Sequence, residues 1–326
     1  MTDPIPSTPV TILVPGKFHD HALNRIAGEF RLVAIERADA SLVDKAECEA
    51  VRGIAAFGGV DAAFIDAFPN LEIIANFGVG YDSVDAAHAA TRGVMVTNTP
   101  DVLTEEVADT TVGLLISTLR ELPKAEAWLR AGKWASQGPI PVSPLTLRTR
   151  SIGIFGMGRI GLAIAKRLES FGLPIAYHNR RPVEGVAYTY YRSLKALAKA
   201  VDTLICIAPG GAATEKAINA EILAALGPNG VFVNSGRGST VDEDALAKAL
   251  SDGTIAAAGL DVFANEPHVP QALLDAPNTV LLPHVASGSA FTRRAMADLC
   301  VDNLVSWFST GKPLTPVPET ARIKKQ

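Results

Sequence analysis

The sequence has few cysteines and no two of them close together. Its three thiols, at Cys48, Cys206 and Cys300, are odd in number and form no CxxC pair. This spacing argues against a disulfide scaffold and against a zinc or redox motif. We therefore interpret the cysteines as ordinary packing residues and expect a reducing compartment and no metal site.

Long apolar runs are also absent. No stretch approaches the roughly 18 consecutive apolar residues that a membrane span needs. Residues 1–7 lack the basic start and the apolar centre of a secretory signal peptide. These absences predict a cytoplasmic protein with no membrane partner.

No charge of one sign dominates. Lys and Arg number 30 and Asp and Glu 34, which gives a formal net charge of −4, so no overall attraction to nucleic acid is expected. Hydrophobic residues make up 48% and charged residues 20%, a usual globular mixture. A length of 326 residues suits two domains better than one.

Short apolar runs alternate with helix-like stretches in both halves of the chain. In the first half, runs lie at residues 10–14, 53–57, 71–75 and 94–96, with helix-like stretches at 20–29 and 41–50. In the second half, runs lie at 151–155, 174–178, 201–208, 230–234, 256–260 and 279–282. Strands that alternate with helices indicate parallel βαβ units. The sequence therefore predicts an α/β fold with two doubly wound parallel sheets.

Two longer helical stretches complete this pattern. One runs from residue 104 to about 130 and contains Pro123, which should kink or break it. A loop rich in Gly and Pro is expected at 132–144, and a further helix at 290–310.

A GxGxxG motif directly follows the run at 151–155 and opens a helix. Gly156 would permit the tight turn, Gly158 would let the backbone approach a pyrophosphate, and Gly161 would let helix and strand pack closely. Free N–H groups at the start of that helix would face the anion, with Arg159 and Ile160 in its first turn. An ordinary βα turn is the alternative, but the order strand, motif, helix favours dinucleotide binding.

The end of the next strand indicates which dinucleotide is bound. An acidic residue there would accept from the ribose 2′-hydroxyl of NAD. Instead the strand runs into Asn179, Arg180 and Arg181, and two adjacent guanidiniums suit a 2′-phosphate. We therefore predict NADP as the preferred cofactor and NAD as the alternative. A solvated basic turn would explain the same residues without a cofactor.

Three titratable or charged residues each follow an apolar run in the second half. They are Arg237, Glu266 and His284. Because ligands of doubly wound sheets bind beyond the carboxyl ends of the strands, these side chains could converge on one crevice. Taken singly, they are usually a surface ion-pair partner, a turn residue and a structural histidine.

The surrounding motifs resemble those of a known family. They are FGVGYD at 77–82, NTP at 98–100, EEVAD at 105–109, VNSGRG at 233–238, AGLDVFANEP at 258–267 and PHVASG at 283–288. In this order they resemble the D-isomer-specific 2-hydroxyacid dehydrogenases, over nearly the whole chain from about Val10 to Phe308. Within that family the chain resembles the glyoxylate/hydroxypyruvate reductase branch.

The resemblance implies a catalytic set. Arg237 would clamp the substrate carboxylate and polarise the 2-oxo group, since its planar fork matches that geometry. His284 would be the acid–base group, and Glu266 would orient its imidazole and favour the protonated ring.

The resemblance also implies binding residues. Backbone N–H groups of Val79 and Gly80 would bind the substrate carboxylate, and Phe57 and Gly58 would form a second pocket loop. Asp261 would lie near the nicotinamide carboxamide. Further cofactor contacts are expected at Ala208, Pro209, Ser235 and Gly288.

The resemblance further implies the domain organisation. The dinucleotide-binding domain would comprise residues 105–289, and a flavodoxin-like substrate domain would comprise 1–104 and 290–326. Residues 121–144 would form an arm that mediates contacts in a homodimer, in which Trp134 reaches the partner's site or simply packs.

These expectations lead to one function and two alternatives. We predict NADPH-dependent reduction of the small 2-oxo acids glyoxylate and hydroxypyruvate to 2-hydroxy acids. One alternative is a reductase of larger aromatic 2-oxo acids such as hydroxyphenylpyruvate. The other, from a different class, is a nucleotide-sensing, corepressor-like binding protein.

Overall fold

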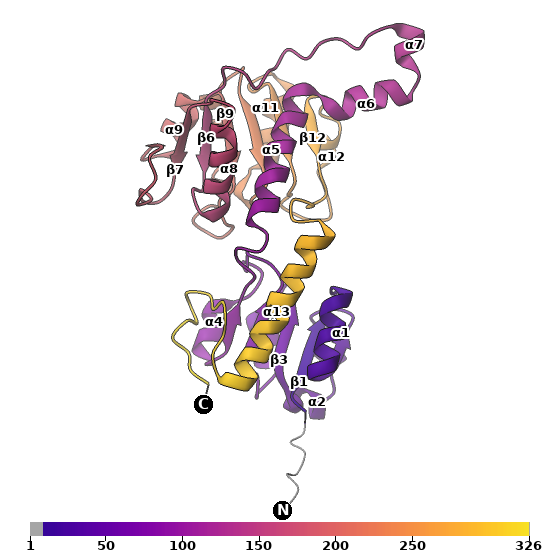
Figure 1. Cartoon of the computed structure of the whole chain (residues 1–326), viewed down its shortest axis with the longest axis vertical. Helices are drawn as coiled ribbons and strands as arrows, with labels where there is room; N and C mark the ends of the chain where they lie inside the picture. Colours follow the sequence, from indigo (N-terminus) through magenta and orange to yellow (C-terminus); the bar gives the residue numbers. More distant parts are fainter. Residues whose placement is uncertain (1–8, 326) are drawn as a thin grey trace, which may run out of the picture. The chain divides into compact units, whose positions relative to one another are not determined.

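The computed structural model describes residues 9–325, so the prediction about residues 1–7 lies outside the described residues. The chain forms two compact units, which are described separately. The terminal unit comprises Met1–Leu103 and Ser289–Gln326, and the central unit comprises Thr104–Gly288. Each unit has its own parallel β-sheet (Figure 1). The expected α/β fold with two doubly wound sheets is confirmed.

The terminal unit has a five-stranded parallel sheet in the order β2-β1-β3-β4-β5. Its strands are β1 (Thr11–Pro15), β2 (Arg31–Ile35), β3 (Val51–Ala56), β4 (Ile73–Asn76) and β5 (Met95–Thr97). Its helices are α1 (Asp20–Glu29), η1 (Ala40–Leu42), α2 (Lys45–Ala50), α3 (Ala62–Asp66), α4 (Ala86–Thr91) and α13 (Ala290–Thr310). Because β2 and β3 flank β1 on opposite sides, the strand order reverses between β1 and β3. Ligands of such sheets bind at this switch point.

Both ends of the chain build the terminal unit. Helix α13 begins after Ser289, whose side chain accepts a hydrogen bond from the Thr292 N–H, and it ends at Gly311 with φ +72°. It contacts α1, β3 and β4. Beyond it, the Val317 N–H donates to Val96 O at 3.0 Å. This C-terminal segment therefore covers the edge strand β5.

The central unit has a seven-stranded parallel sheet in the order β12-β11-β10-β9-β6-β7-β8. The strands are β6 (Ile152–Phe155), β7 (Ile175–His178), β8 (Thr189–Tyr190), β9 (Thr203–Cys206), β10 (Val231–Asn234), β11 (Ala257–Leu260) and β12 (Thr279–Leu281). The helices are α5 (Thr104–Arg120), α6 (Leu122–Arg130), α7 (Lys133–Gln137), α8 (Arg159–Glu169), α9 (Leu194–Ala200), α10 (Ala220–Leu226), η2 (Gly238–Thr240), α11 (Glu243–Ser251) and α12 (Gln271–Leu274). The strand order reverses between β6 and β9, which is the second switch point.

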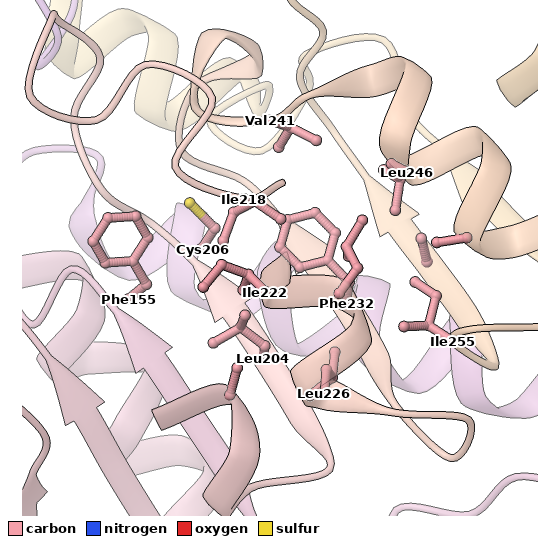
Figure 2. Packing of buried hydrophobic residues seen from close by; sticks show 14 of the residues in the cluster. Phe155, Leu204, Cys206, Ile218, Ile222, Leu226, Phe232, Val241, Leu246 and Ile255 are labelled. Atoms are coloured by element: carbon pink, nitrogen blue, oxygen red, sulfur yellow. The ribbon is translucent and has the colours of Figure 1, made fainter. Parts of the chain in front are cut away.

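The core of the central unit lies on both faces of its sheet. On one face Phe155, Leu204 and Phe232 pack with Ile222 and Leu246 from helices α10 and α11 (Figure 2). On the other face, residues next to these in the same strands pack against helices α5 and α8. These residues are Ile154, Ile205 and Val233. Successive residues of a strand point to opposite faces, so strands covered on both sides appear as unbroken apolar runs.

Helices α6 and α7 form an arm that stands out from the body of the central unit (Figure 1). The expected helix break is confirmed, because α5 ends at Arg120 and Glu121 adopts the left-handed region with φ 49°. The expectation of a loop throughout 132–144 was wrong, since α7 occupies Lys133–Gln137. Glycines with positive φ at both ends, Gly132 and Gly138, allow this single short helix to form between sharp turns.

Candidate active site

The glycine motif forms a tight turn between β6 and α8. Gly156 has φ +107°, and a Cβ added there would come within 2.7 Å of the Ala208 nitrogen. A Cβ added at Gly161 would come within 2.2 Å of the Gly156 carbonyl oxygen. At Gly158 an added Cβ would meet no described atom within 4 Å beyond its chain neighbours. The first and third glycines are therefore required by packing, whereas the second leaves open space at the start of the helix.

The N-terminus of α8 faces this opening without a side-chain cap. Gly158 is its N-cap residue and cannot provide one, whereas Ser193 and Asn219 cap α9 and α10 with their side chains. Uncapped N–H groups and the helix dipole favour an anion at this place. Nearby in the sheet, beyond the end of β10, the Ser235 hydroxyl oxygen is buried and has no hydrogen-bond partner among residues 9–325. These features fit a bound dinucleotide.

The end of β7 supplies the residues predicted to read the ribose. The Asn179 side chain accepts a hydrogen bond from the Met157 N–H at 2.6 Å and donates to the Met157 carbonyl at 3.3 Å. It therefore ties the strand end to the glycine motif. Arg180 and Arg181 follow it and are exposed to solvent, and within the described chain no hydrogen bond or ion pair is formed by either guanidinium.

The other predicted cofactor residues lie around the same strand ends. Ala208 is 2% exposed and packs against the glycine turn. The carbonyl of the next residue, Pro209, accepts from the Thr214 hydroxyl at 2.7 Å. The N–H of Gly288 donates to Val285 O at 2.7 Å, which closes a tight turn.

Glu266 and His284 form a direct pair. Nδ1 of His284 lies 2.8 Å from Oε2 of Glu266, and the Phe263 N–H donates to Oε1 at 3.0 Å. Burial alone would raise the pKa of Glu266. The hydrogen bonds from His284 and the Phe263 N–H, with the charges of His284 and Arg237, outweigh it and hold the pKa below its usual value. The carboxylate is therefore ionised at neutral pH and only accepts hydrogen bonds.

Arg237 lies close enough to Glu266 to affect its pKa, so the structure brings together the three predicted side chains within the central unit. Its Nη1 donates to Gly236 O at 2.9 Å. Its own carbonyl accepts from Asn234 Nδ2 at 3.0 Å and from the Thr240 hydroxyl at 2.6 Å. These bonds fix the backbone from which the guanidinium extends.

Asp261 fixes the backbone of the histidine loop. Its carbonyl accepts from the His284 N–H at 2.8 Å, and its carboxylate accepts from the N–H groups of Val285 at 2.8 Å and Ala286 at 2.9 Å. His284 itself has φ 53°, a left-handed conformation that costs a non-glycine residue energy. The side chain predicted to lie near the carboxamide therefore also stabilises this strained turn. Sequence reasoning missed that role, because nothing in the spacing shows which groups a buried carboxylate meets.

Glu243 is a further residue that the sequence did not single out. Its Oε1 accepts from the Ala264 N–H at 2.9 Å, next to the N–H that Glu266 accepts. Burial raises its pKa; the Ala264 hydrogen bond opposes this shift, and the nearby carboxylates Asp244 and Glu266 add to it. Two carboxylates thus hold consecutive N–H groups of the loop that carries Glu266.

The remaining predicted residues belong to the terminal unit. Phe57 directly follows β3 and is 54% exposed, and its ring lies 5.5 Å from that of Phe77. Gly58 has φ +144° and accepts from Ser83 Oγ at 3.0 Å. Val79 and Gly80 lie in the loop after β4, the strand that pairs with β3. The sheet therefore brings both predicted loops to the carboxyl ends of adjacent strands.

Two features of other protein classes are absent from the described residues. Within residues 9–325, no helix is long and apolar enough to cross a membrane. The same residues contain no group of three or more His, Cys, Asp or Glu side chains that could hold a metal ion. All three cysteines are free thiols.

Comparisons with known proteins agree with this site. Residues 112–286 match the model of the D-isomer specific 2-hydroxyacid dehydrogenase, NAD binding domain. The chain is 62% identical to an NADPH-dependent glyoxylate/hydroxypyruvate reductase from Sinorhizobium meliloti, solved in complex with NADP and malonate. The match covers 98% of this chain and 99% of that one with a TM-score of 0.96.

Two plant enzymes are similar in sequence. A glyoxylate/hydroxypyruvate reductase A from Arabidopsis thaliana is 47% identical over 80% of this chain and 83% of its own length. A hydroxyphenylpyruvate reductase from Plectranthus scutellarioides is 46% identical over 83% of this chain and 87% of its own length. The family model covers more than half of the chain and these relatives match most of it, so the chain belongs to the D-isomer-specific 2-hydroxyacid dehydrogenases.

Proposed function

We propose that the protein reduces glyoxylate and hydroxypyruvate to the corresponding 2-hydroxy acids with NADPH. The observation that carries the proposal is the Glu266–His284 pair with Arg237 beside it, in the same unit as the glycine turn. The proposal is supported by the similarity of the chain to two glyoxylate/hydroxypyruvate reductases, from Sinorhizobium meliloti and Arabidopsis thaliana. We assign dinucleotide binding to residues 105–289 and substrate binding to 1–104 and 290–326.

The proposed residue roles follow from charge and proton position. Arg237 binds the substrate carboxylate and draws electron density from the 2-oxo group. Because the Glu266 carboxylate only accepts, Nδ1 of His284 carries a proton toward it, and Nε2 is the atom that delivers a proton to the oxygen at C2. When bound, NADPH supplies the hydride that C2 receives. Hydride and proton together convert the carbonyl to a hydroxyl.

We propose NADP over NAD because of the basic end of β7. Arg180 and Arg181 are exposed, and no acidic residue occupies the strand end. Guanidiniums form charge-assisted bonds to a phosphate, whereas a ribose hydroxyl gains little from them. The complex of the Sinorhizobium meliloti reductase with NADP supports this preference.

We propose a homodimer formed through residues 121–144, which comprise helices α6 and α7 and the segment after them. Their apolar side chains Leu122, Leu129, Trp134 and Val142 are between 46% and 92% exposed, and exposed apolar surface of this kind is typical of an interface. The free thiols at all three cysteines support a reducing compartment, and we propose the cytoplasm.

A reductase of larger aromatic 2-oxo acids is the second candidate. The similarity to the Plectranthus scutellarioides enzyme favours it. So does Phe57, an exposed ring that could stack on an aromatic substrate.

One assay tests both candidates. Purified protein is given NADPH or NADH with glyoxylate, hydroxypyruvate or hydroxyphenylpyruvate, and loss of the reduced nicotinamide is followed by its near-ultraviolet absorbance. We expect the highest kcat/KM with NADPH and one of the two small acids. A higher value with hydroxyphenylpyruvate would favour the second candidate, and no turnover with any acid would refute both.

A further inference from the structure

Two carbonyl oxygens of the loop after β4, residues 78–81 (the β4 loop), are held by one buried side chain. Asn76, the last residue of β4, is 3% exposed. Its Nδ2 donates to Gly78 O and to Gly80 O, both at 3.1 Å. The Thr99 N–H also donates to Gly78 O, at 2.9 Å. Both carbonyls are thereby turned toward the interior.

A second asparagine holds the carbonyl between them. Nδ2 of Asn98 donates to Val79 O at 2.8 Å. Asn98 is itself anchored, since its N–H donates to Thr315 O at 3.2 Å and its carbonyl accepts from the Thr315 hydroxyl at 2.6 Å. Thr315 of the C-terminal segment therefore fixes the backbone of the residue whose side chain holds the β4 loop.

These bonds determine where the N–H groups of the β4 loop point. Among the described residues, only the bond between Glu266 and Pro267 is cis. In a trans peptide the C=O of one residue and the N–H of the next lie in one plane and point in opposite directions. With three successive carbonyls held by asparagines, the N–H groups of Val79, Gly80 and Tyr81 point away from them.

These N–H groups are also unused. Within residues 9–325 the N–H groups of Val79, Gly80 and Tyr81 donate no hydrogen bond. Successive backbone N–H groups that have no partner within the protein can form a binding site for an anion. All three residues are partly exposed, so an anion in solution can reach them.

We infer that Asn76 and Asn98 are positioning residues that aim the N–H groups of Val79, Gly80 and Tyr81 at the substrate carboxylate. The inference rests on the proposed function, because it takes the anion to be the carboxylate of a 2-oxo acid. It adds Tyr81 to the two residues expected from the sequence and explains how a loop without a cationic side chain holds its N–H groups in place. An asparagine that only stabilised the fold would not affect carboxylate affinity selectively.

The experiment titrates oxalate, a small dicarboxylate, into the NADP-loaded protein in a calorimeter. The variants are Asn98→Ala and Asn98→Asp, the second of which keeps the shape but loses the Nδ2 donor. Asn76→Ala is also titrated, provided that its Tm shows that the variant is folded. The matched control is Asn70→Ala, which removes a similar bond from Nδ2 to the Glu49 carbonyl, 2.7 Å long, elsewhere in the same unit.

We expect oxalate to bind about tenfold more weakly to Asn98→Ala and weaker still to Asn98→Asp, the size of one lost positioning bond. In both Asn98 variants the Kd for NADPH and the Tm should stay unchanged. In Asn70→Ala the affinity for oxalate, the Kd for NADPH and the Tm should all stay unchanged. With glyoxylate, KM should rise by the same factor while kcat changes less than about twofold.

Two results would overturn the inference. One is unchanged oxalate affinity in folded Asn98→Ala and Asn98→Asp, and the other is no oxalate binding by the unmodified protein. If the unmodified protein binds oxalate but reduces no 2-oxo acid, the proposed function fails. The comparison of oxalate affinities then still decides whether the asparagines position an anion site.

Discussion

The Gly156 carbonyl oxygen lies where a side chain at residue 161 would have to be: a Cβ added to Gly161 would approach it to 2.2 Å. The obstacle is backbone, which cannot rotate away as a side chain can. The helix start can therefore pack this closely on the end of β6 only with glycine at residue 161. Gly158 has no such obstacle, and the two glycines can be tested against each other.

Gly161→Ala should lower the free energy of unfolding by a few kcal/mol, in the usual range for overpacking of a close contact. Gly158→Ala should leave the Tm nearly unchanged, because the added methyl group meets open space in the free protein. It should nevertheless raise the Kd for NADPH at least tenfold by keeping the pyrophosphate from the backbone. Thermal unfolding measures the stability of the two variants, and a fluorescence titration with NADPH measures their Kd. Normal NADPH affinity in Gly158→Ala would place the cofactor elsewhere.

His284→Ala should reduce kcat on the order of 10²–10⁴-fold, the usual contribution of a general acid. The Kd for NADPH should change little, since the imidazole is assigned to proton transfer. Initial rates with glyoxylate and a binding titration provide the comparison. Near-normal turnover would remove His284 from the mechanism.

Glu266→Gln tests the carboxylate that faces the imidazole. Its Oε2 lies 2.8 Å from Nδ1 of His284, so an amide in its place should leave the imidazole less well oriented and lower kcat. The Glu266 pKa is held below its ordinary value of 4.5. The ionised group therefore stabilises the fold above about pH 4.5, and this contribution is lost as the pH falls through the lowered pKa. Glu266→Gln should accordingly lose less stability on acidification than the unmodified protein. Initial rates with glyoxylate and acid titrations of unfolding measure the two effects, and a normal kcat together with unchanged acid sensitivity would contradict the assignment.

Replacing Arg180 and Arg181 together by alanine should raise the KM for NADPH tenfold or more, since charge-assisted bonds to the 2′-phosphate are lost. The KM for NADH should stay nearly constant. Arg192→Ala, which removes an exposed guanidinium farther along the chain, is the control. Equal increases in both KM values would mean that the arginines do not distinguish the cofactors.

Asp261→Asn should destabilise the histidine loop. An amide has one oxygen, so the N–H of Val285 or Ala286 would lose its acceptor, at a cost of about 1–3 kcal/mol. We expect kcat to fall more than the Kd for NADPH rises, because the left-handed turn at His284 relaxes. Steady-state kinetics, an NADPH binding titration and unfolding of Asp261→Asn measure these effects. Asp242→Asn is the control, because it also alters an acceptor of a backbone N–H in this unit. Unchanged kcat would show that the turn does not depend on Asp261.

The sequence predicted most strands of both units and missed one strand in each, for physical reasons. Strands covered on both faces, such as β6 and β10, are unbroken apolar runs. Every residue of the edge strand β2 is exposed or half-buried, and β8 has only two residues. The sequence analysis predicted neither strand: β8 is too short to form an apolar run, and the short run at residues 32–35 of β2 was not assigned.

The candidate site likewise contains residues that the sequence predicted and residues that it did not. Arg237, Glu266 and His284 were predicted as a group because each follows a strand, and parallel strands end at one edge of a sheet. The structure brings them together, and their roles stay predictions. Asn76 and Asn98 act through hydrogen bonds to backbone carbonyls, and these depend on loop conformation. No spacing of residue types indicates such contacts.

Because α13 lies after the central unit in the chain yet packs on β3 and β4 of the terminal unit, the order of synthesis matters. A ribosome produces residues 11–97, with all five strands, well before residue 290. The face of the sheet that α13 covers must therefore remain uncovered while nearly two hundred further residues are made, roughly ten to forty seconds at usual elongation rates. During that interval the nascent terminal unit exposes apolar strand residues, and chaperones that recognise such surfaces have their best opportunity to bind it.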